Sequence, residues 1–110
     1  MKIYDYLTND FHNPMKDQVL LHAVCNIIGI GYEPILQGIS ADNISLRICN
    51  VFFRYGVSRR GTGDIGTCSI MMQELIQFLL SKGIITEARL HAQIQEVWER
   101  LYREEYGPML

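Results

Sequence analysis

The sequence predicts an all-α fold, a compact bundle of four main helices. Apolar residues recur at helical spacing in four segments, glycine or proline stands at the ends of those segments, and no long run alternates between apolar and polar residues. The chain has 110 residues, of which 48% are hydrophobic, so it is long enough to bury one core. We therefore expect a single helical domain over residues 1–110.

The first helix is predicted to begin at Pro14, because Asn13 is a good N-cap and proline suits the first helical position. Residues 1–12 are predicted to form a loose N-terminal arm. Apolar residues line one face of the helix until Gly29 ends it. The following segment, 32–38, contains a proline and is predicted to hold at most one or two helical turns.

The second helix is predicted to follow Ser40, as its N-cap, and to run to Gly56. A glycine-rich segment over 56–66 comes next, predicted as a loop or small hairpin. Thr67 is predicted to cap the third helix, which Gly83 ends. That helix is apolar nearly all round, which predicts a central place in the fold or burial by a second subunit.

Thr86 is predicted to begin the last helix, which Gly107 and Pro108 end. Six of its side chains form an apolar stripe and an aromatic ridge, the pattern of a helix that packs along another helix. Packing in the core of the domain explains the stripe by itself, whereas the aromatic ridge suggests an interface. We expect all six side chains to contribute to an interface in a homodimer: Leu90, Ile94, Val97, Trp98, Leu101 and Tyr102.

Composition narrows the possible functions. The formal net charge is -2 and the pI is about 5.9, which argues against a chain that binds polyanions over its whole surface. Three cysteines without regular spacing predict free thiols in a reducing compartment, taken to be the cytoplasm. The first ten residues carry acids and no apolar stretch, so no signal peptide is expected, and no segment predicts a membrane span.

The loop sequence SRRGTGDIGT contains a Gly-x-Gly-x-x-Gly pattern. A dinucleotide-binding fold would need a strand before these glycines, whereas the preceding segment has a helical pattern. A phosphate could still meet free backbone N–H groups ahead of the third helix, with Arg59 and Arg60 beside it. Asp64 opposes an anion in the same loop. The interpretation that we favour is a connector.

The second helix has an unusual distribution of side chains. At 100° per residue, two apolar stripes lie on nearly opposite sides, and a narrow polar wedge without any acid separates them. The wedge consists of Asn43, Arg47, Asn50 and Arg54. These residue types read nucleic acid, and Arg59 and Arg60 would extend the basic track. The alternative is a solvated edge whose arginines pair with the glutamates of the last helix.

The segment GISADNISLRI, residues 38–48, resembles the turn and second helix of a helix-turn-helix protein. The resemblance implies that Gly38 makes the turn, Ser40 caps the recognition helix and Ile44 contacts the core. It also implies DNA binding, with the loop over 56–66 acting as a wing that carries Arg59 and Arg60 to the phosphates. The sequence departs from the pattern at Pro34, where the first helix should continue.

No set of residues has the spacing of an enzyme active site, and His22 with Cys25 lacks the partners that a zinc site needs. We therefore expect no enzyme activity, no cofactor and no metal. The first hypothesis is a dimeric DNA-binding regulator of helix-turn-helix or winged type. The second is a helical protein-interaction module without nucleic-acid binding, in which the same arginines contact an acidic protein partner.

Overall fold

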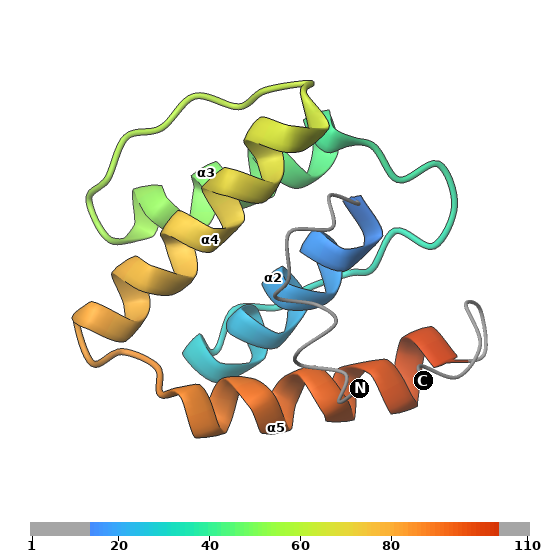
Figure 1. The fold of residues 1–110 in the computed structure, drawn as a ribbon, viewed down its shortest axis with the longest axis vertical. Coiled ribbons are helices and arrows are strands. Elements are labelled where there is room, and N and C mark those ends of the chain that lie inside the picture. Colours follow the sequence, from blue (N-terminus) through green and yellow to red (C-terminus); the bar gives the residue numbers. More distant parts are fainter. Residues whose placement is uncertain (1–13, 104–110) are drawn as a thin grey trace.

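The computed structural model describes residues 14–103, and within them the predicted all-α fold is confirmed (Figure 1). The helices are α2 (Pro14–Ile28), α3 (Ala41–Arg54), α4 (Ile65–Ser81) and α5 (Glu87–Val97), with the π-helical stretch η1 (Trp98–Tyr102) continuing α5. These residues contain no strand, so the hairpin considered for 56–66 is absent and residues 57–64 form a loop. The predicted arm, 1–12, and the expected cap Asn13 lie outside the described residues.

Helices α3 and α4 lie side by side and run in the same direction, because the loop between them returns along the length of α3 (Figure 1). Helix α2 lies between this pair and α5 and contacts all three. All of residues 16–25 are buried, so α2 is the central helix. The sequence pattern had suggested α4 for a central place, yet α4 leaves Ile65 and Ile70 45% and 55% exposed.

Two buried polar side chains of α2, those of Gln18 and Asp17, have hydrogen-bond partners in other segments. Gln18 donates from Nε2 to the carbonyl oxygen of Ile35 at 2.7 Å and accepts the N–H of the same residue at 2.8 Å. The Ser69 hydroxyl donates to a carboxylate oxygen of Asp17 at 2.7 Å. These bonds let polar side chains occupy the centre of the bundle, because burial of a polar group is costly only when no partner is supplied.

The predicted caps are confirmed at two helices. The side chains of Ser40 and Thr86 accept backbone N–H groups at the starts of α3 and α5. Helix α4 differs from the prediction, because Asp64 is its N-cap and Thr67 lies inside the first turn. The Asp64 carboxylate accepts both the N–H and the hydroxyl of Thr67, at 2.8 and 2.6 Å.

The helix-turn-helix resemblance is not supported by the backbone. Gly38 has a φ of 68° and Ser40 caps α3, as the resemblance implied. However, α2 and α3 are joined by residues 29–40, none of which is helical. A helix-turn-helix joins its two helices by a turn of about three or four residues. The structure therefore gives an all-α bundle in which a helix-turn-helix is not shown.

Candidate functional site

Helix α2, the connector 29–40 and helix α3 enclose a cleft of about 460 Å³. Its apolar floor is formed by side chains that include Leu21, Cys25 and Val51, which are at most 4% exposed. Burial raises the pKa of the Cys25 thiol to about 11, so this thiol is neutral at physiological pH. The floor therefore offers apolar surface and no reactive thiolate.

Arg47 forms part of the cleft wall and is held in one orientation. Its Nη1 group donates to the carbonyl oxygen of Glu33 at 2.7 Å, and its Cζ atom lies 4.8 Å from the centroid of the Tyr32 ring. A guanidinium has five N–H donors, so one bond to a carbonyl leaves others for a ligand. The ordering entropy of this arginine is already lost before any anion binds.

Tyr32 is itself fixed from the side of α2. Its hydroxyl donates to Gln18 Oε1 at 3.0 Å, and its ring stacks on the His22 ring with centroids 4.7 Å apart. Burial raises the pKa of Tyr32 to about 12, which keeps the phenol neutral. His22 Nδ1 lies 3.1 Å from the Tyr102 hydroxyl of η1. A continuous set of ring contacts thus connects Arg47 with the C-terminal part of the bundle.

Arg54 and Asn50 also line the cleft, at its exposed rim. Within residues 14–103, no hydrogen bond or ion pair engages the side chain of either residue. Phe53 lines the same cleft and is 74% exposed. Among the described residues, the cleft lining carries one carboxylate, that of Glu33, against the two guanidinium groups of Arg47 and Arg54. The mouth of the cleft is therefore net positive and borders exposed apolar surface.

Three of the four residues of the predicted wedge, Arg47, Asn50 and Arg54, meet in this cleft. Asn43 is exposed on the first turn of α3 and does not line it. Arg59 pairs with Glu74 and lies over the buried Phe52 ring, with Cζ 5.4 Å from its centroid.

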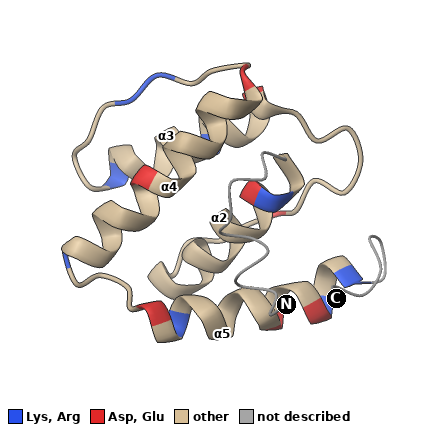
Figure 2. Ribbon diagram, viewed as in Figure 1, with Lys and Arg blue, Asp and Glu red and all other residues tan. Residues whose placement is uncertain are grey.

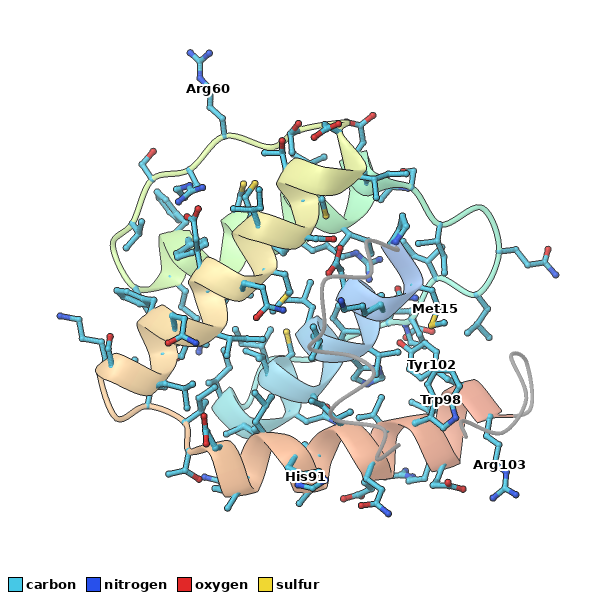
Figure 3. The ribbon with its side chains drawn as sticks, viewed as in Figure 1. Met15, Arg60, His91, Trp98, Tyr102 and Arg103 are labelled. Carbon is cyan, nitrogen blue, oxygen red and sulfur yellow. The ribbon has the colours of Figure 1, made fainter. Side chains whose placement is uncertain are left out.

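Arg60 is exposed on the loop that returns along α3, where the basic residues of that segment lie (Figure 2), and its side chain points away from the helices (Figure 3). In this structure the two loop arginines therefore do not join the arginines of the wedge in the cleft.

The glycine-rich loop has a packing role. Gly61 and Gly63 of the loop, and Gly66 in the first turn of α4, all avoid positive φ angles, so their backbone conformation does not require glycine. A Cβ atom on Gly61 would stand 3.2 Å from Leu46 Cδ2 of α3, which shows how closely the loop approaches that helix. The start of α4 is occupied by the Asp64 carboxylate, whose charge opposes a phosphate there.

Five of the six residues predicted for a dimer interface lie in the core of this chain. Leu90, Ile94, Val97, Trp98 and Tyr102 are at most 2% exposed, and only Leu101 is more open, at 40%. Figure 3 shows Trp98 and Tyr102 directed toward α2. Their spacing reflects packing of α5 and η1 on α2 within one molecule. The homodimer stays a prediction. Of the six residues predicted for its interface, Leu101 is the one whose side chain is exposed enough to contact a second copy.

Comparisons with protein-family models, with curated proteins and with solved structures find no match to this chain. Among the described residues, no helix combines the length and apolar character needed to cross a membrane. The same residues bring no three histidine, cysteine, aspartate or glutamate side chains together as a metal site. The cleft between α2 and α3 is therefore the feature from which we argue function.

Sequence reasoning missed the other half of this site. The wedge on α3 was visible from helical periodicity, but nothing in the sequence places Tyr32 and Glu33 against Arg47. Both lie in an irregular connector, where periodicity gives no direction for a side chain. One signal for this half of the site was available, namely Tyr32 in the segment GIGYEP. The glycines and the proline around Tyr32 predict an exposed backbone there.

Proposed function

We propose that this protein is a non-enzymatic interaction module that binds an acidic segment of a protein partner in the cleft between α2 and α3. One observation carries the proposal: Arg47 and Arg54 converge on the mouth of an apolar-floored cleft beside the exposed Phe53. A partner segment that carries carboxylates next to apolar side chains complements both parts of this surface. We place this activity in the cytoplasm, in keeping with the three free cysteines.

The geometry favours a protein partner over duplex DNA. A recognition helix enters the major groove with a convex face, whereas Arg47 and Arg54 line a concave surface. Arg59, the residue expected on phosphate, already pairs with Glu74. Aromatic and arginine side chains beside an apolar pocket are typical of protein-protein hot spots.

The test is selection of peptides from a randomised display library against the full chain. Arg54→Glu reverses a charge at the cleft rim, and Arg60→Glu makes the same change on an exposed arginine of the 57–64 loop. We expect selected peptides to carry acidic and apolar residues together. They should lose affinity by about tenfold or more with Arg54→Glu and keep it with Arg60→Glu.

Two results would contradict the proposal. One is the recovery of peptides whose binding is indifferent to Arg54→Glu, or of no peptides at all. The other is tight binding of mixed-sequence duplex DNA that both charge reversals weaken, with a steep dependence on salt concentration. That second result would instead support the hypothesis that these arginines contact DNA in a DNA-binding regulator.

A further inference from the structure

The exposed face of α3 carries two parallel rows of side chains with the same repeat. Leu46 and Phe53 are 57% and 74% exposed, and they are seven residues apart (53 minus 46). Arg47 and Arg54 stand next to them with the same separation (54 minus 47), and Asn50 lies midway. Seven residues make about two turns of an α-helix, a rise of about 10.5 Å. An apolar row thus runs beside a cationic row.

This face is bordered on both sides by non-helical segments. On one side, Arg47 contacts Tyr32 and Glu33 of the connector. On the other side, the 57–64 loop approaches Leu46 through Gly61. Between these borders, Phe53 and Arg54 remain exposed. A partner that lies along α3 would be guided by both segments.

The spacing of the two arginines discriminates between a helical and an extended partner. A strand advances about 3.3 Å per residue, so about three residues span 10.5 Å. Side chains three residues apart on a strand point to opposite faces, so an extended segment does not match the repeat of one row of arginines. On a helix, residues seven apart return to the same face, the repeat by which two helices pack along each other.

We infer that the partner segment is an amphipathic α-helix that lies along α3. It presents two carboxylates seven residues apart to Arg47 and Arg54, and an apolar seam to Leu46, Phe53 and the cleft floor. This inference rests on the proposed function and specifies its partner. It corresponds to recognition of a helix in a groove, with charge pairs along one edge setting the register.

The probes for a test are three synthetic peptides of equal length. The first is a stapled helix with a leucine seam and two glutamates seven residues apart. The second is the same stapled helix with one glutamate moved by two positions, which turns its carboxylate to another face. The third has the first sequence without the staple and with a central proline, which prevents a continuous helix. Affinities for the full chain are measured by fluorescence anisotropy.

We expect the first peptide to bind about tenfold or more tightly than the second and the third. Arg54→Glu should remove the difference between the first two peptides, and Arg60→Glu should preserve it. Phe53→Ala should weaken the two stapled helices alike, because both keep the apolar seam. Equal affinity of the first two peptides, or undiminished binding of the proline peptide, would overturn the helical inference.

The two proposals fail in different ways. If the library yields acidic peptides that depend on Arg54 but lack the seven-residue spacing or contain prolines, the partner is not a helix and the interaction module stands. If no acidic peptide from either experiment depends on Arg54, the cleft does not bind an acidic segment and both proposals are wrong.

Discussion

At the scale of single residues, Gln18 connects the central helix to the cleft. Its side-chain amide satisfies both backbone groups of Ile35 and accepts the Tyr32 hydroxyl, so one residue fixes the connector that forms a wall of the cleft. An amide can serve a backbone N–H and C=O at once because it carries a donor and an acceptor side by side. A hydrophobic residue of similar size could not replace it.

We expect Gln18→Ala to lower the free energy of unfolding by about 2 kcal/mol, because it leaves half-buried polar groups of the connector without partners. The matched control is Gln37→Ala, a glutamine of the same connector whose side chain is exposed. It should change stability by less than about 0.5 kcal/mol. Urea denaturation measures both values, and equal losses for the two variants would show that the connector is not held by Gln18.

His22 predicts a pH dependence of stability. Burial, and secondarily the positive charge of Arg100, lower the pKa of His22 below its ordinary value of 6.5. The unfolded chain therefore binds a proton at His22 more readily than the folded chain does. The stabilisation that neutral His22 contributes is complete above its pKa in the unfolded chain, about 6.5. It is lost as the pH falls through the lower pKa that His22 has in the folded chain.

The measurement compares the wild type with His22→Gln by urea denaturation between about pH 7.5 and 5. We expect the wild type to lose stability more steeply on acidification, since titrations of other groups are common to both proteins and cancel in the difference. Burial raises the pKa of Tyr32, whose ring stacks on that of His22, to about 12, so Tyr32 remains neutral over this range of pH. Parallel pH profiles would show that His22 titrates alike in the folded and unfolded chains.

At the scale of elements, capping residues decide where α3, α4 and α5 begin. Asp64 is the N-cap of α4 and accepts two hydrogen bonds from Thr67. We expect Asp64→Ala to cost about 1 kcal/mol of stability and Asp64→Asn, which keeps an acceptor, to cost less. Thr67→Ala removes only a hydroxyl that donates to the same carboxylate, so its effect should be smaller than that of Asp64→Ala. A larger loss for Thr67→Ala in thermal or urea denaturation would make Thr67 the cap.

The positions of the helices could be predicted well from the sequence, because the residues that begin and end a helix act locally. Ser40, Thr86 and the glycines after α2, α3 and α4 act within a few residues of themselves. Which helix becomes central depends on distant partners instead. Lys16, Asp17 and Gln18 have the composition of a solvated turn, yet all three are buried. The partners of Asp17 and Gln18 come from α4 and the connector, segments that no local pattern connects to α2.

The site was predictable in part for the same reason. The wedge of Arg47, Asn50 and Arg54 follows from the geometry of one helix and could be derived from its sequence. The wall contributed by Tyr32 and the floor contributed by Leu21 depend on how the connector folds back over α2. Arg59 was grouped with the wedge by sequence proximity, whereas its position is set by Glu74, far along the next helix.

At the scale of the whole molecule, packing within a single chain accounts for the apolar stripe of α5 and η1. Residues that repeat every three or four positions pack equally well on a helix of the same molecule or of a second copy, so the sequence pattern alone does not separate the two. The burial of Ile94 and Trp98 against the rest of the bundle uses this stripe within the monomer. Stability of the folded chain should then be independent of protein concentration.

We expect Ile94→Val, which removes one methylene group from a fully buried side chain, to cost about 1 kcal/mol at every protein concentration. Leu101→Ala, at a position that is 40% exposed, should cost less than about 0.5 kcal/mol. An obligate dimer behaves differently, because its unfolding midpoint rises with concentration. Urea denaturation at low and high protein concentration, together with sedimentation equilibrium, separates the two cases. A concentration-dependent midpoint that Leu101→Ala abolishes would place a dimer contact at the one exposed apolar position of this stripe.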